Sequence, residues 1–533
     1  MRRRREPAMT LVTDLVLLGG RVHTLDTRGT VAEAVAITGG RVSAVGPAAD
    51  VARLAGPSTR VVHLAGRTVI PGLVDSHCHF ENAGMDGHTV SFAGVRTLDA
   101  ALDRIAALAA TREPGAWVQG QPWNPALQLV EGRGPDRREL DRAAGGRPVY
   151  LPEGHAATAS TAALERSGID PGGHDGRLVE GAMHTVARVV PDWTREERAA
   201  QLTAAMRALN RRGITSVVAG ALRPADVETV RELARDGCST LRVAAMVMPT
   251  GELNPSVPLA DWEALLASGP PAPIGQHYLT RGIKLQVDGG MTLGTAATRE
   301  PYLTRPGYHG ELFAGRDRLA ELVGAAHRAG WPVGTHVVGD AAIDLALDVY
   351  EATRHRGLLP DVLIHASLIQ RDQIARARAL GVQVAAQIPF LWRNRAAIAG
   401  HLGDARTEAA VPLRDLVDGL GLDGVAAGTD YPINALDPFQ NIYAMTTRRD
   451  AASEVVGGAQ AVTRAEALRL YTTSGAAHTG EQEVKGRLTA GALADLAVLG
   501  ADPLTASDDE LRATEVLMTV VGGQIVHDTG LLG

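Results

Sequence analysis

Strand-like and helix-like segments alternate along most of this 533-residue chain, and that alternation limits its fold more than any other feature. From residue 195 onward, segments of helical period separate short aliphatic runs that are typical of buried parallel strands. With a buried run near the start, the pattern predicts strands at residues 68–79, 214–219, 241–248, 282–287, 332–336, 362–365, 382–387 and 424–429. Eight such strands, alternating with helices, predict an α/β fold, a (β/α)8 TIM-type barrel.

The two ends of the chain differ in character from the middle. Residues 13–71 combine aliphatic runs with glycine turns, and the tail repeats this pattern at 494–499 and 517–526. We therefore expect a small composite β-sandwich, built from residues 9–70 and 471–533, beside a barrel of residues 71–470. The irregular stretch at about 81–195 is interpreted as an insertion after the first strand. It is expected to cover the face where barrels of this type have their active sites.

Composition and charge limit the partners and the compartment. The formal charge of −7 argues against nucleic acid as the main partner. Only Cys78 and Cys238 are cysteines, so no disulfide framework is implied and a reducing cytoplasm fits. No window reaches the roughly 18 consecutive apolar residues of a membrane helix, and the basic start lacks the apolar run of a signal peptide. We expect a cytoplasmic protein with a small-molecule partner and no membrane; a homodimer and a start at Met9 rather than Met1 stay open.

The buried run at 68–80 ends on two histidines, His77 and His79. Residues two apart on a strand point to the same face, so both imidazoles project together while Cys78 points away. Two imidazoles that converge at a strand end suit a divalent metal ion. His-x-His alone is a weak signal, because a polar pair at the mouth of a loop has the same sequence.

Further nitrogen and oxygen ligands lie on or after other predicted strands. Lys284 is on the fourth strand, His336 and His365 end the fifth and sixth, and Asp430 follows the eighth. The carboxyl ends of barrel strands meet at one face, so these side chains are expected to converge. Taken alone, a histidine at a strand end more often caps or packs, and an aspartate after Gly-Thr more often caps a helix. Placement of such residues on five strand ends favours a metal site over chance.

At these residues the chain resembles the amidohydrolase superfamily and, within it, amidohydrolase family 3, which includes the N-substituted formamide deformylases. The matching stretches are residues 69–79, 283–289, 335–340, 363–366, 428–432 and 491–499. Relatives usually have Arg-x-x-Glu-His on the sixth strand, where this chain has Leu-Ile-His at 363–365. Relatives often have Asp-Gly-His in the insertion, where this chain has Pro-Glu-Gly-His at 152–155. These departures affect the assignment of the substrate more than the assignment of the metal ligands.

The resemblance implies a set of ligands for two metal ions, the first held by His77, His79 and Asp430 and the second by His336 and His365. Lys284 would bridge both ions as an Nζ-carboxylated lysine formed with CO2, which an arginine could not become. Lys284 and Lys485 are the only lysines among 53 lysines and arginines, so a lysine here marks a task for which a guanidinium is unsuited. Zinc suits these ligands best, with iron and manganese as alternatives.

The resemblance also implies catalytic and substrate-binding residues. Asp430 would take a proton from a metal-activated water and return it to the leaving nitrogen, while His155 would help to hold the oxyanion. Residues expected to line the substrate pocket, each with packing as its alternative role, are Trp123, His155, Arg299, Tyr302 and Trp392.

Together these features predict a metal-dependent hydrolase of a non-peptide C–N bond, with a linear amide such as an N-substituted formamide as the expected substrate. A deaminase, or a hydrolase of a cyclic amide or lactone, on the same metal site is one alternative. A non-catalytic metal-binding scaffold is another, which the full ligand set disfavours.

Overall fold

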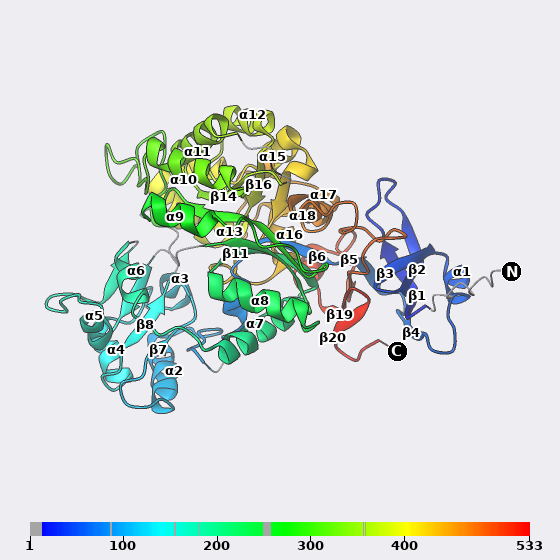
Figure 1. Cartoon of the computed structure of the whole chain (residues 1–533), viewed down its shortest axis with the longest axis horizontal. Coiled ribbons are helices and arrows are strands. Elements are labelled where there is room, and N and C mark those ends of the chain that lie inside the picture. Colours follow the sequence, from blue (N-terminus) through cyan, green and yellow to red (C-terminus); the bar gives the residue numbers. More distant parts are fainter. Residues whose placement is uncertain are drawn as a thin grey trace, which may run out of the picture.

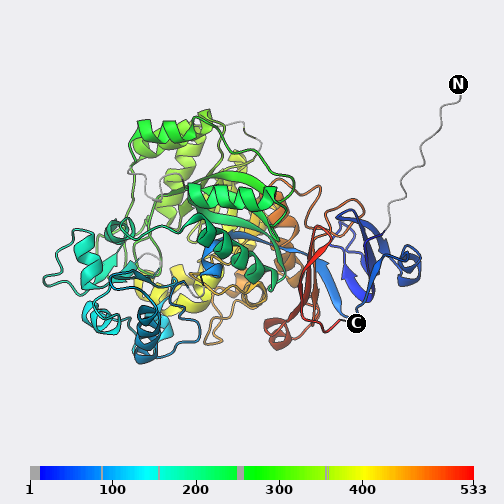
Figure 2. The same cartoon turned by 60° about the horizontal axis from the view of Figure 1, so that its bottom comes forward.

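The computed structural model describes residues 13–85, 88–153, 156–179, 181–248, 257–354, 357 and 359–532. Within these residues the chain forms a barrel, a sheet that contains strands from both chain ends, and a smaller body inserted between the first two barrel strands (Figure 1). The inserted body and the terminal sheet lie at opposite ends of the molecule in both views (Figures 1 and 2).

Eight parallel strands form the barrel, and their spatial order follows their order in the sequence. They are β6 (Leu73–Cys78), β11 (Ile214–Leu222), β12 (Arg242–Val247), β13 (Tyr278–Gln286), β14 (Val333–Val337), β15 (Val362–His365), β16 (Gln383–Ala386) and β17 (Val425–Ala427). The predicted (β/α)8 barrel is therefore confirmed, and the strand predicted at 362–365 has the observed bounds.

Helices between and after these strands cover the outside of the barrel (Figure 1). They are α7 (Arg195–Asn210), α8 (Pro224–Arg235), α9 (Leu259–Leu266), α10 (Arg316–Arg328), α11 (Asp340–Ala352), α12 (Arg371–Leu380), α13 (Pro389–Leu402), α14 (Asp404–Glu408), α15 (Leu413–Leu420), α16 (Pro438–Thr447), α17 (Arg464–Leu470) and α18 (Thr473–His478). Local sequence sets their ends: α7 begins with a reciprocal capping box between Thr194 and Glu197. Gly381 follows the last residue of α12 and caps it with a φ of 72°, which suits glycine.

The terminal sheet joins strands from both ends of the chain in the order β20-β19-β18-β5-β1-β2-β3, with β4 paired to β1. These strands are β1 (Leu15–His23), β2 (Val31–Thr38), β3 (Arg41–Gly46), β4 (Arg60–His63), β5 (Thr68–Pro71), β18 (Leu496–Leu499), β19 (Val516–Val521) and β20 (Gln524–Asp528). Short helices α1 (Ala48–Ala52) and α19 (Asp508–Arg512) connect some of them. Buried aliphatic side chains from both ends share one core, among them Leu17, Val69 and Val498.

The run predicted as one strand at 68–79 is two strands that belong to different sheets. Strand β5 pairs with β1 and β18 in the terminal sheet, whereas β6 pairs with β11 in the barrel. Gly72 separates them, and a Cβ atom there would lie 2.2 Å from the Oγ1 atom of Thr215. The Thr215 side chain therefore leaves no room for a larger residue at the point where the chain changes sheets, and glycine suits this position.

The insertion contains a four-stranded sheet in the order β10-β9-β8-β7. Its elements are a 3-10 helix at Phe80–Gly84, α2 (Leu98–Ala110), β7 (Val118–Gln119), α3 (Pro125–Gln128), α4 (Arg137–Ala143), β8 (Val149–Pro152), β9 (Ala156–Ala159), α5 (Thr161–Arg166), β10 (Arg177–Val179) and α6 (Gly181–Ala187). It has apolar clusters of its own, which include Phe92, Ile105 and Leu151. No helix in the described part of the chain is long and apolar enough to cross a membrane.

Candidate active site

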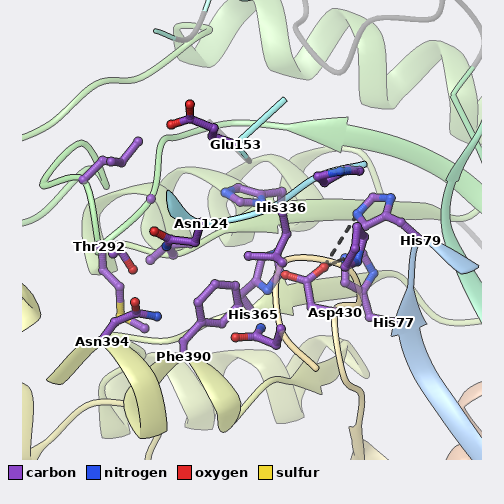
Figure 3. A pocket seen from close by; sticks show the side chains of 18 of the residues that line it. His77, His79, Asn124, Glu153, Thr292, His336, His365, Phe390, Asn394 and Asp430 are labelled. Atoms are coloured by element: carbon purple, nitrogen blue, oxygen red, sulfur yellow. Dashed lines mark ion pairs between the residues drawn. The ribbon is translucent and has the colours of Figure 1, made fainter. Parts of the chain in front are cut away.

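One pocket at the carboxyl ends of the barrel strands brings together all of the predicted metal ligands, and Figure 3 labels each of them except Lys284. They are His77, His79, Lys284, His336, His365 and Asp430. They come from the first, fourth, fifth, sixth and eighth strands or from the residues that follow them. The barrel thus brings together residues that are far apart in the sequence.

His77, His79 and Asp430 form the tightest group. The Oδ1 atom of Asp430 lies 3.3 Å from Nε2 of His77 and 3.6 Å from Nε2 of His79. One ligand atom from each of the three residues lies within 4.8 Å of the others. This spacing matches side chains that share one metal ion.

Two further imidazoles, those of His365 and His336, continue from this group across the pocket. The ring centroids of His77 and His365 are 5.1 Å apart, and those of His365 and His336 are 4.6 Å apart. Lys284, which is 3% exposed, also lines this part of the pocket from β13. A second ligand group thus lies beside the first.

Burial controls the charge of these side chains. Burial, followed by the charge of Lys284, lowers the pKa of His77 well below its ordinary value, and burial likewise lowers that of His365. Burial also lowers the pKa of Lys284 to about 7, although Asp430 opposes this shift. For His79 burial disfavours the charged form, but the hydrogen bond and charge of Glu81 raise its pKa above the ordinary value. Neutral imidazoles and amines are the forms that can bind a metal or react as nucleophiles.

The residues present fit a divalent metal ion. The Nδ1 atoms of His77 and His365 are buried without a hydrogen-bond partner in the described part of the chain. A buried polar atom without a partner is unfavourable unless something else satisfies it. Neutral imidazoles beside a carboxylate supply the borderline nitrogen and oxygen donors that such ions prefer.

Asp75 ties the first and eighth strands together behind the ligands. Its carboxylate accepts hydrogen bonds from the amide of His77 (3.2 Å), the amide of Thr429 (3.0 Å) and the hydroxyl of Thr429 (2.6 Å). The amide of Asp430 donates to the carbonyl of His77 over 2.8 Å. These bonds fix the separation between the strand ends that carry the tight ligand group.

Two ligands and a nearby glycine have unusual local geometry. His365 and Asp430 have φ values of 72° and 54°, a left-handed conformation that is costly for residues other than glycine. On β11, a Cβ atom at Gly220 would lie 2.8 Å from Cε1 of His77 and 3.1 Å from Cε1 of His79. Asp75 and Gly220 were not identified as site residues from the sequence. The available signal for Gly220 is a glycine inside a buried strand, which indicates that another group approaches the backbone closely.

The structure places Trp123 and Tyr302 away from the pocket, among the residues it describes. Trp123 stacks on Phe92 with ring centroids 3.8 Å apart, so its neighbours Pro122 and Asn124 line the pocket instead. Tyr302 is 2% exposed and donates its hydroxyl to the carbonyl of Ala296 over 2.8 Å. Both side chains therefore pack.

Arg299 and Trp392 are also held elsewhere. Arg299 forms ion pairs with Asp344 at 2.7 Å and with Asp372 at 2.8 Å. Trp392 lines a separate, smaller cleft that Arg448 also lines. His155 lies outside the described residues.

Several pocket residues were missed from the sequence. Helix α13 contributes Phe390, Arg393 and Asn394, and α6 contributes Met183 and His184. The spacing of the α13 residues places them on one helix face, but their identity as pocket residues depends on which face α13 turns to the barrel.

Comparison with known proteins identifies the family and supports the fold. Residues 60–527 match the model of the amidohydrolase family. The N-substituted formamide deformylase of Arthrobacter pascens is 28% identical over 557 residues, covering 98% of this chain and 99% of that protein. The putative amidohydrolase YtcJ of Bacillus subtilis (strain 168) is 26% identical and covers 96% of this chain and 98% of its own.

A solved structure is similar over nearly the whole length. An uncharacterized metal-dependent hydrolase from Pyrococcus horikoshii OT3 has a TM-score of 0.76 at 25% identity, covering 93% of this chain and 99% of that chain. Its likeness includes the barrel whose strand ends carry the ligand cluster. The chain therefore belongs to the amidohydrolase family and is a metal-dependent hydrolase that acts on carbon–nitrogen bonds.

Proposed function

We propose that this protein hydrolyses a linear amide such as an N-substituted formamide, with water as the nucleophile. The observation that carries the proposal is the convergence on one pocket of His77, His79, Lys284, His336, His365 and Asp430. The Arthrobacter relative, which matches this chain from end to end, is named for such a substrate.

The ligands divide into two groups for two ions. His77, His79 and Asp430 would hold one ion, His336 and His365 the other, with Lys284 between them as an Nζ-carboxylate. Zinc is the proposed metal, and iron and manganese are alternatives. When bound, such ions would supply Lewis acidity that acidifies a water molecule and polarises an amide carbonyl.

The state of Lys284 supports its carboxylation. Only a neutral amine can attack CO2, and burial lowers the pKa of Lys284 to about 7. About half of such amines are neutral at pH 7, whereas fewer than about 1 in 1,000 are neutral at the ordinary lysine pKa of ~10.4. The larger neutral fraction of Lys284 therefore favours its attack on CO2.

Asp430 is the proposed proton carrier. Its carboxylate lies against the Nε2 atoms of His77 and His79, inside the pocket, where it can accept a proton from the attacking water. The same carboxyl group then returns the proton to the leaving nitrogen, so the amine departs neutral. His155 is proposed as the hydrogen-bond donor to the oxyanion.

The test is hydrolysis by zinc-loaded protein prepared with bicarbonate. The substrate panel contains linear formamides and acetamides, cyclic amides, lactones and aminopurines. We expect linear formamides to release formate and amine in equal amounts. The matched control is Asp430→Asn, which is expected to lose about 100- to 10,000-fold in turnover.

Each other result on this panel has a defined meaning. Faster turnover of a cyclic amide, a lactone or an aminopurine would replace the linear-amide assignment with one of the alternatives. Metal-loaded protein that hydrolyses nothing in the panel would reject it.

A further inference from the structure

One face of α13 extends the pocket away from the metal ligands. Phe390, Arg393 and Asn394 follow the spacing i, i+3 and i+4, so they share a helix face, and all three line the pocket. The ring centroid of Phe390 lies 5.6 Å from that of His365. In Figure 3, Phe390 lies between His365 and Asn394. The face thus leads outward from the ligands.

Asn394 presents a buried amide that the described protein does not satisfy. Its side chain lines the pocket although the residue is 6% exposed, and its Oδ1 atom has no hydrogen-bond partner. A buried amide without a partner is unfavourable. An atom of a bound ligand would supply the missing bond.

Arg393 presents a cation without a matching carboxylate in the described structure. Burial, and then the charge of Arg96, lower the pKa of its guanidinium below the ordinary value, and no acidic group opposes that shift. Glu153 also lines the pocket, but its carboxylate pairs with Arg177 at 2.6 Å. Among the described residues, no carboxylate therefore pairs with the Arg393 guanidinium, and Arg96 is exposed and outside the pocket lining.

The same pocket also has apolar walls. Phe390, Met183, Met291 and Leu293 line the same pocket. A ligand that reaches from the metal ligands along the α13 face therefore passes the Phe390 ring, and the pocket also offers thioether surface; both suit a hydrocarbon spacer.

We infer that the face of Phe390, Arg393 and Asn394 is a subsite for a carboxylate at the far end of the substrate. The inference rests on the proposed function and deepens it. The substrate class is an N-formyl or N-acyl amine whose amine portion consists of an apolar spacer that ends in a carboxylate. A guanidinium matches a planar carboxylate. A carboxylate cannot donate to Oδ1 of Asn394, so the amide must rotate by about 180° about its Cβ–Cγ bond; its N–H groups then occupy the unpartnered position and donate to the same oxygens.

The test uses matched pairs of N-formyl compounds with aliphatic spacers of increasing length. One member of each pair ends in a carboxylate and the other in the neutral carboxamide. The quantity measured is the ratio of kcat/KM for the carboxylate to kcat/KM for the carboxamide. We expect the wild-type ratio to exceed one and to peak at one spacer length.

Two variants of the subsite and one control show whether Arg393 and Asn394 cause the preference for the carboxylate. Arg393→Gln is expected to reduce the ratio about 10-fold, the usual effect of losing a hydrogen bond to a charged group. Asn394→Asp, which is nearly isosteric, places a negative charge in the subsite and should bring the ratio below one. Arg395→Gln is the matched control, because Arg395 lies on another helix face near Asp450 (4.0 Å) and is absent from the pocket lining. Its ratio should equal that of the wild type.

Binding measurements distinguish failure of the subsite from failure of the proposed function. If formamides are hydrolysed but the ratio is the same in Arg393→Gln, Asn394→Asp and the wild type, the subsite is rejected and the function stands. If no compound is hydrolysed, calorimetric binding of the same carboxylates to zinc-loaded protein decides. If the affinity for the carboxylates falls in Arg393→Gln but not in Arg395→Gln, the proposed subsite stands. Affinity unaffected by Arg393→Gln, as expected when only the metal binds the carboxylate, rejects it.

Discussion

Replacement of Gly220 by alanine tests whether strand β11 sets the positions of the two neighbouring imidazoles. The new Cβ atom would lie 2.8 Å from Cε1 of His77, and 3.1 Å and 3.2 Å from Cε1 and Nε2 of His79. Carbon atoms in contact are normally about 3.5–4.0 Å apart. The rings or the strand would therefore have to move by roughly 0.5–1 Å.

A shift of this size matters much more for function than for folding. Functional groups must be held within about 0.5 Å of their productive positions, and a displacement of about 1 Å can reduce a rate about 100-fold. Overpacking costs about 1–3 kcal/mol, while exchange of glycine for alanine within a strand returns about 0.5–1 kcal/mol. We therefore expect Gly220→Ala to fold, with metal content reduced and turnover lower by about 10- to 100-fold.

The assay combines metal content per chain, kcat/KM and thermal unfolding on the same preparations. Gly46→Ala is the control, because Gly46 is also a strand glycine but its added Cβ would meet no atom within 4 Å. The control should match the wild type in all three measurements. Full metal content in Gly220→Ala, with turnover within about twofold of wild type, would refute the reasoning. A rate change of that size corresponds to less than about 0.5 kcal/mol in activation free energy.

Three further predictions concern the metal, Lys284 and the terminal sheet. Chelation should abolish hydrolysis and added zinc or manganese should restore it; full activity in metal-free protein would contradict the metal site. Lys284→Ala should lose metal content and regain some activity with acetate or propionate. Lys284→Arg should stay inactive, because a guanidinium cannot be carboxylated and adds positive charge near two cations; normal turnover in it would exclude the bridge. Removal of β18–β20 should expose the edge of β5 and cause aggregation, and a soluble, fully active truncated protein would oppose this.

The sequence predicted the barrel because each strand is a short aliphatic run between helical segments. Strand β15 (Val362–His365) was predicted to the residue, and the ligands followed because chemistry-bearing side chains were expected at strand ends. The division of 68–79 into β5 and β6 could not be predicted, since both halves are fully buried and a buried run shows no change of partner.

The substrate side of the pocket was poorly predictable for a different reason. Trp392 and Asn394 are two residues apart on α13, and only the orientation of that helix decides which one faces the pocket. The left-handed backbone of His365 and Asp430 likewise depends on tertiary packing, because neither residue type signals it locally.

The position of β5 between β1 and β18 has a consequence for the order of events during synthesis. One neighbour, β1, leaves the ribosome shortly before β5, but the other, β18, follows only after the entire barrel. Until then the nascent chain carries an open apolar strand edge next to the residues that lead into β6, and such edges recruit other chains or chaperones. The strand that leads into the His77 and His79 segment therefore gains its second neighbour only after the whole barrel has been made, so we expect metal loading to be completed after synthesis of β18.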